Sequence, residues 1–300
     1  MQIADPRNKN ILIYINGKLY PREEAKISVF DSVVQGGDAV WEGLRVYDKR
    51  VFYLDRHLNR LINSAHIMGF KNIPDVDSIK DALFSTLDAN EMFDETHVRL
   101  TLTRGKKTTS GMDPKLNIFG CSLIIIAEWK KPIFPEAGIK LVTASIRRNN
   151  PQFVDSKIHH NNLINNILAK MEANYADADE AIMLDSNGFV SETNACNIFM
   201  VKNGEIHTPL PDACLPGITR GLIIEIAKEL NFPMIERNIS VSEFYVADEV
   251  FTTGTMGELT PVYEMDGRKI KNGGKGSVSQ KMMHTFRKRT LELGEDIIVD

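Results

Sequence analysis

Apolar and polar residues alternate along several short stretches of the chain, as they do in strands that bury one face. The stretch 97–104, HVRLTLTR, shows this alternation, and 121–127 is continuously apolar, as in a buried strand. Within 11–20, the pair Asn16-Gly17 separates two apolar stretches and predicts a β-hairpin with a two-residue turn. A strand pair that turns at Asp48-Lys49 is expected within 41–53, and other strands are expected at 139–145, 180–184, 197–201, 248–252 and 261–265.

Other stretches repeat apolar residues at the spacing of an amphipathic helix. One such stripe follows Lys157 and is predicted to pack inward. Its members are Leu163, Ile164, Ile167, Leu168 and Met171. A further helix follows the turn Pro216-Gly217, and Thr219 is predicted to cap its start. The remaining helices are expected at 56–68, 77–88 and 277–293.

This order of strands and helices predicts an α+β protein of two domains. The first domain is expected to span 1–128. Residues 129–138, WKKPIFPEAG, contain two prolines and are predicted to form an interdomain linker. The second, larger domain is expected to span 139–300.

The composition narrows the class of protein. The chain has 300 residues, of which 43% are hydrophobic and 25% charged, as in ordinary globular proteins. The net charge of −4 gives no indication of nucleic-acid binding. No apolar run reaches the ~18 residues of a membrane-spanning helix, and the polar start MQIADPRNKN shows no signal peptide. The three cysteines lack any CxxC pairing, so we expect reduced thiols, no metal site and a cytoplasmic location.

Four stretches carry residue types that suit a bound phosphate and a reactive amine. Lys157 lies where an irregular segment leads into a helix, a rigid place to present one amine. Glu192 interrupts the otherwise neutral run GFVSETNACNIF. The helix start in LPGITR offers free amides to an anion, and the hydroxyl-rich loop TTGTMGELTP can contact the same anion.

In this order, these stretches resemble the fold-type IV pyridoxal-phosphate enzymes. That family includes branched-chain and D-amino-acid aminotransferases, (R)-amine transaminases and aminodeoxychorismate lyases, and the similarity is closest to the branched-chain enzymes. It covers about 14–270, with the signature stretches WEGLRVYD, HLNRL, ETNACNIF, LPGITR, ADEVFTTGT and ELTPV. The resemblance implies a small α/β N-terminal domain, a larger β-barrel-like C-terminal domain with helices, and pyridoxal 5'-phosphate as cofactor.

The resemblance also implies roles for individual residues. Lys157 matches the lysine that forms a Schiff base with the cofactor, and Glu192 matches the carboxylate beside the protonated pyridine nitrogen. The positions that match phosphate-binding residues are Arg60, Ile218, Thr219 and Thr255. The chemistry requires these types, because a displaced lysine amine can move a proton and a buried carboxylate favours a charged ring nitrogen.

Substrate recognition is less clearly marked. Trp41 matches an aromatic pocket residue, Arg99 matches an arginine that handles substrate carboxylates, and Met256 is expected beside the pocket. Branched-chain enzymes carry tyrosines at three positions that here hold Gly36, His97 and Asn162. His97 is therefore also expected to face the substrate, and the amino donor and its enantiomer stay open.

The resulting hypothesis is a transaminase that moves an amino group from an apolar, branched-chain-type amino acid to 2-oxoglutarate. Alternatives are a D-amino-acid or (R)-amine transaminase, an aminodeoxychorismate lyase, and a cofactor-binding protein without turnover. The resemblance implies a homodimer whose other partners are small molecules, with no nucleic acid or membrane. His159 and His160 lack a third ligand, so a structural role is expected for them before a metal site.

Overall fold

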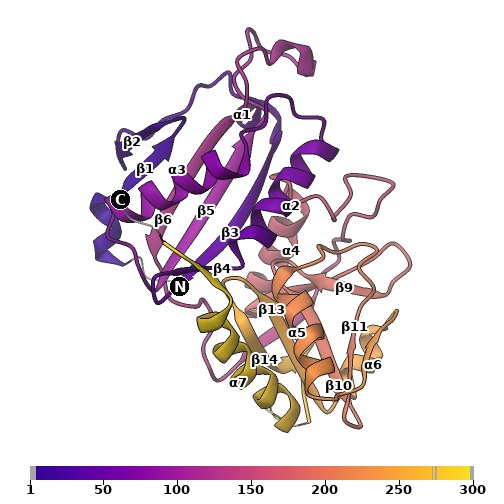
Figure 1. The fold of residues 1–300 in the computed structure, drawn as a ribbon. Helices are drawn as coiled ribbons and strands as arrows, with labels where there is room; N and C mark the ends of the chain where they lie inside the picture. Colours follow the sequence, from indigo (N-terminus) through magenta and orange to yellow (C-terminus); the bar gives the residue numbers. More distant parts are fainter. Residues whose placement is uncertain (1–4, 272, 274–275, 298–300) are drawn as a thin grey trace. The chain divides into compact units, whose positions relative to one another are not determined.

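The computed structural model describes residues 5–271, 273 and 276–297, so 1–4, 272, 274–275 and 298–300 lie outside it. The chain forms two compact units (Figure 1). The first unit comprises 1–131, 158–162 and 290–300, and the second comprises 132–157 and 163–289.

This division differs from the predicted domain limits in three places. Strand β6 (Ser122–Trp129) includes the first residue of the predicted linker. Residues 158–162 return to the first unit, where Asn161 N donates to Ala39 O over 2.9 Å. Residues 290–300 also belong there, because β16 (Gly294–Asp296) pairs with β4 (Arg50–Phe52). The predicted second domain, 139–300, therefore loses two short segments to the first unit.

The first unit is built on a seven-stranded sheet. Its strand order is β16-β4-β3-β5-β6-β1-β2. Besides β4, β6 and β16, it contains β1 (Leu12–Ile15), β2 (Lys18–Pro21), β3 (Ala39–Tyr47) and β5 (Thr96–Thr103). The predicted hairpin is confirmed, with Ile15 opposite Lys18. Asn16 and Gly17 between them have φ of 48° and 89°, the left-handed conformation that a tight hairpin turn requires. The predicted turn at Asp48-Lys49 is confirmed between β3 and β4.

Two long helices cover this sheet. α2 (Leu54–Ile67) and α3 (Val76–Ala89) share one core with the strands, in which Leu61, Leu83 and Leu100 are fully buried. Figure 1 shows α3 crossing the sheet. The shorter helical elements are η1 (Pro6–Asn10), α1 (Ser32–Gly36) and η2 (Pro114–Leu116). This packing holds β3 and α2 against each other.

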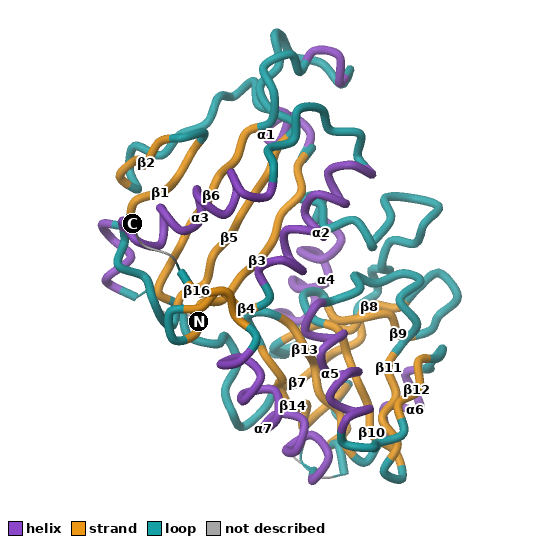
Figure 2. Tube along the Cα trace, viewed as in Figure 1, coloured by secondary structure: helices purple, strands orange, loops and turns teal. Residues whose placement is uncertain are grey.

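The second unit is built on a nine-stranded sheet. The strands are β7 (Ile139–Thr143), β8 (Glu180–Leu184), β9 (Val190–Thr193), β10 (Asn197–Lys202), β11 (Glu205–Thr208), β12 (Met234–Glu236), β13 (Glu249–Gly254), β14 (Glu258–Met265) and β15 (Arg268–Lys269). Their order is β12-β11-β10-β13-β14-β7-β8-β9, with β15 on β14. The last strand, β9, turns directly into β10, and Thr193 N donates to Cys196 O over 2.8 Å. The sheet therefore curls back on itself (Figure 2).

Four helices accompany this sheet: α4 (Ile164–Tyr175), α5 (Ile218–Glu229), α6 (Val241–Tyr245) and α7 (Ser277–Glu292). The predicted inward stripe of α4 is wrong. The helix buries Ala169 and Ala173, which pack with Ala181 and Met183 of β8. Small alanines allow α4 to approach the strands closely, and this turns the larger residues outward. The exposed ones are Ile164, Ile167, Leu168, Met171 and Tyr175.

None of the helices within the described ranges is long and apolar enough to cross a membrane. The same residues contain no group of three or more His, Cys, Asp or Glu side chains that could hold a metal ion.

Candidate active site

A buried carboxylate organises the functional residues of the first unit. Glu42, on β3, has no exposed surface, and three side chains contact its carboxylate. Arg60 of α2 approaches it with two nitrogens, Nε to Oε1 and Nη2 to Oε2, each over 2.7 Å. His57 Nδ1 lies 2.7 Å from Oε2, and His159 Nδ1 lies 3.1 Å from Oε1. Arg60 therefore has a fixed orientation before any ligand is considered.

The charges in this cluster follow from its burial. Burial opposes a charged Glu42, but Arg60 and His159 outweigh it and hold the pKa of Glu42 well below its usual value. Burial also lowers the pKa of His57, and it lowers that of His159 to about 4, despite the nearby carboxylate. Both imidazoles are consequently neutral at pH 7, and Glu42 with Arg60 forms an ion pair.

Trp41, beside Glu42 on β3, connects this cluster to Arg99. The Trp41 ring lies 4.1 Å from the His159 ring, centroid to centroid. The guanidinium carbon of Arg99 lies 3.4 Å from the Trp41 centroid, and Arg99 Nη2 donates to Asn161 Oδ1 over 3.3 Å. Burial lowers the pKa of Arg99 to about 10, so it stays charged at pH 7.

His97, two residues before Arg99 on β5, lies beside Trp41 across Gly43. A Cβ added at Gly43 would be 3.3 Å from His97 Nε2 and 3.5 Å from the Trp41 ring. Burial, with Lys130, Arg45 and Arg99 adding repulsion, lowers the pKa of His97 to about 3. Where a tyrosine was expected, the chain thus places a neutral imidazole.

Lys157 belongs to the second unit, and the chain enters the first unit at the next residue. Its backbone N donates to Asp155 Oδ1 over 3.0 Å, and its Nζ lies 3.4 Å from Asp212 O. Ser191 Oγ, beside Glu192 on β9, donates to Ala213 O over 2.7 Å, so Lys157 Nζ and β9 contact adjacent residues of the same loop.

Glu192, on β9, is buried and held by three donors. Arg148 Nε donates to Oε1 over 2.6 Å, Asn197 Nδ2 donates to Oε2 over 3.0 Å, and Leu215 N lies 3.3 Å from Oε1. Burial raises the pKa of Glu192, and Arg148 opposes that rise. A carboxylate has about four acceptor sites, so Oε2 retains room for one more donor.

The start of α5 is tied to Glu192 through Asn197. Asn197 Nδ2 also donates to Leu215 O over 2.9 Å, just before the helix. Gly217 is the N-cap, and no side chain caps the helix, so the predicted capping role of Thr219 is wrong. Thr219 is already the second residue of the helix, and the N-cap position must be glycine because a Cβ at Gly217 would lie 2.1 Å from Asn197 Oδ1. The first amides of α5, at Ile218 and Thr219, are left for an anion.

Thr255 and Met256 lie in the turn between β13 and β14. Thr255 and Met256 are partly exposed, and Met256 O accepts from Ile133 N over 3.1 Å. Gly257 is the next residue in the turn, and a Cβ added to it would lie 3.0 Å from the Phe134 ring. The turn is therefore closely packed against 133–134 within the second unit.

The structure divides the predicted residues between the units. The first unit carries Trp41, Arg60, His97 and Arg99, and the second carries Lys157, Glu192, Ile218, Thr219, Thr255 and Met256. Sequence reasoning missed Glu42 and Asn197. A signal for Glu42 existed, since a charge within the strand motif WEGLR must be exposed or paired.

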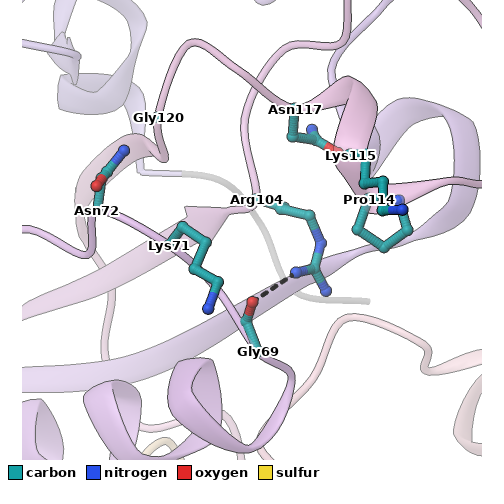
Figure 3. A pocket seen from close by; sticks show the side chains of 8 residues that line it. All are labelled: Gly69, Lys71, Asn72, Arg104, Pro114, Lys115, Asn117 and Gly120. Carbon is teal, nitrogen blue, oxygen red and sulfur yellow. Dashed lines mark hydrogen bonds between the residues drawn. The ribbon is translucent and has the colours of Figure 1, made fainter.

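A separate cavity of about 250 Å³ lies elsewhere in the first unit (Figure 3). Three of its lining residues are cations: Lys71, Arg104 and Lys115. Arg104 is already paired with Asp38 through Nε over 2.6 Å, and its Nη1 donates to Gly69 O. The two lysines are exposed, so this cavity carries no comparable set of fixed groups.

Most of the chain is similar to known proteins. The family model of amino-transferase class IV matches residues 39–265. Branched-chain-amino-acid aminotransferase-like protein 2 of Arabidopsis thaliana is 57% identical over 95% of this chain. The putative branched-chain-amino-acid aminotransferase of Methanocaldococcus jannaschii is 39% identical over 92% of this chain and 95% of its own length.

The fold is similar to that of a solved branched-chain aminotransferase. The branched-chain aminotransferase of the thermophilic archaeon Thermoproteus uzoniensis, solved with norvaline, superposes with a TM-score of 0.88 at 30% identity. The match covers 96% of this chain and 100% of that one. The chain spans about half the length of the two similar Arabidopsis proteins, 51% and 53%.

Proposed function

Because the chain belongs to the class IV aminotransferases, we propose that it is a pyridoxal-phosphate-dependent transaminase of the branched-chain type. It would move an amino group from an apolar amino acid to 2-oxoglutarate. The observation that carries this proposal is the buried Glu192, held by Arg148 and linked through Asn197 to the uncapped start of α5.

The donor set of the second unit fits this cofactor. Glu192 Oε2 can accept from a protonated ring nitrogen, and the first amides of α5 can bind a phosphate, helped by Thr255. Bound pyridoxal phosphate supplies a ring that withdraws electrons from the substrate α-carbon. A buried carboxylate near the ring nitrogen favours the charged ring on which that withdrawal depends.

Lys157 would anchor the cofactor and then act as the base. Its Nζ has one weak protein contact, the 3.4 Å approach to Asp212 O, so little has to be broken when it moves. In the transamination it would take the proton from the substrate α-carbon and return it to the cofactor side. The bond from Lys157 N to the Asp155 side chain holds the start of the lysine side chain in place.

Arg60 would bind the cofactor phosphate from the first unit. Its two contacts with Glu42 fix the plane of the guanidinium, and the Arg60 side chain is 14% exposed, so one edge can still reach a ligand. A fixed arginine loses less conformational freedom when it binds an anion.

Trp41, His97, Arg99 and Met256 would contact the substrate. Trp41 and Met256 offer apolar surface to a branched side chain, while Arg99 offers a charge to the second carboxylate of 2-oxoglutarate. The depressed pKa of His97 keeps a further positive charge out of this pocket at neutral pH.

The decisive experiment is a donor panel under single-turnover conditions. The purified holoprotein is mixed with L-leucine, D-alanine or (R)-1-phenylethylamine, without an oxo acid, and the change in cofactor absorbance is followed. We expect L-leucine to react fastest by tenfold or more, about 1.4 kcal/mol in the barrier. No reaction with L-leucine, together with fast reaction of either other donor, would reject the branched-chain assignment. A cofactor that none of the three donors converts to the pyridoxamine form would favour a lyase, because only a transaminase makes that conversion with an amino donor alone.

We also propose that the chain acts as a homodimer. Both units expose apolar side chains that a second copy could cover: the α4 face in the second unit, and Val29, Phe30, Val34, Ile118 and Phe119 in the first. Ile167→Asp on α4 should shift the protein towards monomer in sedimentation experiments. Asn174→Asp, on the same helix, should leave it dimeric. A wild-type protein that sediments as a monomer would reject the proposal.

The location we propose is the cytoplasm. It is supported by Cys121, Cys196 and Cys214, which are free thiols in the structure.

A further inference from the structure

Five side chains of the first unit form a continuous row. It begins with Arg60, passes through Glu42, His159 and Trp41, and ends at Arg99. The proposed function assigns the two ends of this row to different tasks, the cofactor phosphate for Arg60 and the substrate carboxylate for Arg99.

His159 is the residue that joins the two halves of the row. Its Nδ1 bonds Glu42, and its ring packs on Trp41 at an interplanar angle of 38°. Its backbone is held as well, since His159 N donates to Ser64 Oγ over 3.1 Å and His159 O accepts from Trp41 N over 2.9 Å. The next residue adds a second bond, from Trp41 Nε1 to His160 O over 3.2 Å. Trp41 is thus fixed by the segment 158–162 through its backbone, its indole nitrogen and its ring face.

We propose that His159 is a positioning residue that fixes the phosphate-binding arginine and the substrate-side Trp41–Arg99 pair in one arrangement. The inference rests on the proposed function and goes beyond it, because it assigns His159 to neither phosphate nor substrate contact. It also specifies two separable contributions, one from the Nδ1 bond and one from the ring face.

The Nδ1 bond acts on the phosphate side. Without it, Glu42 keeps Arg60 and His57 but loses its third donor, and one carboxylate oxygen is left with a single bond. The bond from His159 also restrains rotation of the carboxylate, so its loss leaves the plane that Glu42 shares with Arg60 less fixed. Arg60 should then spend less time in the orientation that suits a phosphate.

The ring face acts on the substrate side. Aromatic pairs at this separation are worth about 0.5–1.5 kcal/mol beyond their buried area. Without the imidazole ring, Trp41 gains freedom to rotate, and Arg99, which packs on Trp41, moves with it. The dicarboxylic acceptor, which needs Arg99, should lose more than an apolar donor.

Two substitutions separate these contributions. His159→Phe keeps a ring against Trp41 but cannot bond Glu42. His159→Asn places an amide nitrogen near the position of Nδ1 but has no ring. His66→Phe, at an exposed position on α2, is the matched control. Three quantities are measured in each protein: the cofactor Kd by absorbance titration of the apoprotein, KM for 2-oxoglutarate and KM for L-leucine.

We expect a crossed pattern. His159→Phe should raise the cofactor Kd roughly tenfold, equivalent to about 1.4 kcal/mol, with a smaller effect on KM for 2-oxoglutarate. His159→Asn should raise KM for 2-oxoglutarate by a similar factor and leave the cofactor Kd and KM for L-leucine within about twofold. Melting curves establish that each variant is folded at the assay temperature, and His159→Gln replaces His159→Asn if that variant is not.

Equal increases in all three quantities would mean general loosening and would overturn the inference, as would variants that match His66→Phe. The wild-type protein separates this failure from that of the proposed function. If it binds no pyridoxal phosphate, the proposed function fails, whereas normal wild-type behaviour with unaffected variants rejects only the role of His159.

Discussion

Arg148 Nε lies 2.6 Å from Glu192 Oε1, and both side chains are buried. Burial pushes the carboxyl group towards its neutral form, and the guanidinium opposes this by attraction. Arg148 Nη1 also lies 3.5 Å from Asn166 Oδ1 of α4, so the helix after Lys157 helps to hold the arginine beside Glu192. The charge state of Glu192 therefore depends on a residue 44 positions away in the sequence.

Removing Arg148 should destabilise the protein strongly. Arg148→Met leaves a buried carboxylate without its ion-pair partner, and we expect the free energy of unfolding to fall by about 3–5 kcal/mol in urea denaturation. Arg147→Met, at the exposed neighbouring position, should cost less than about 0.5 kcal/mol. The double variant Arg148→Met/Glu192→Gln should be more stable than Arg148→Met alone. If it is not, the two residues are not energetically coupled.

Replacing Glu192 should affect turnover more than cofactor binding. A neutral amide cannot stabilise a charged ring nitrogen, so Glu192→Gln should lower kcat on the order of 10²-fold or more, with a much smaller change in cofactor Kd. Glu180→Gln is the control, because Glu180 is also buried in this sheet but bonds Thr193 and Asn194. Similar kcat losses in both variants would point to a structural effect on the sheet.

The covalent anchor can be tested directly. Lys157→Ala should abolish the visible absorption band of the bound cofactor and its retention after borohydride reduction. Lys228→Ala, at an exposed position on α5, should keep both. Persistent borohydride-stable labelling in Lys157→Ala would show that another lysine is the anchor.

Arg60 should show the opposite pattern to Glu192. Arg60→Ala removes a charged phosphate contact, so cofactor Kd should rise roughly 10- to 100-fold, since bonds to charged groups contribute about 1.5–3 kcal/mol. Excess pyridoxal phosphate should restore part of the activity. Arg56→Ala, one turn away on α2 and stacked on Tyr53, should bind the cofactor normally. Activity that excess cofactor cannot restore would argue against a phosphate contact.

Acid should destabilise the fold through its buried histidines. The pKa of His97 falls from 6.5 to about 3 on folding, and that of His159 falls to about 4. Between these values and pH 6.5 the unfolded chain binds protons that the folded chain does not, so the free energy of unfolding decreases as pH falls. His97→Gln should reduce this slope by at most about 1.4 kcal/mol per pH unit, measured by urea denaturation at several pH values. An unchanged slope, or an equal change in exposed His66→Gln, would contradict the pKa assignment for His97.

Local patterns along the chain were enough to predict most of the strands and helices and to indicate the family. Asn16-Gly17 and Asp48-Lys49 are turns at positive φ, which a two-residue hairpin turn needs and which Asn, Gly and Asp adopt more readily than other residues. Alternation over 97–104 similarly identified β5, since one of its faces packs into the core. The signature stretches indicated the fold-type IV family because several of them, in the same order, carry a lysine, a glutamate and an arginine that the chemistry needs.

Contacts between distant segments determine which residues share a buried environment and which helix faces stay exposed, and these contacts had to be seen in the structure. The spacing of apolar residues in α4 could not reveal that Ala169 and Ala173 face the strands. The helix has one face of large apolar residues and one face of alanines, and close packing against β8 selects the alanine face. The sequence also did not show which side chains contact Glu42 and Glu192. His159 and Arg148 lie 117 and 44 residues from the carboxylates they contact. A buried charge constrains its partner by distance in space, and no local pattern in a sequence records that distance.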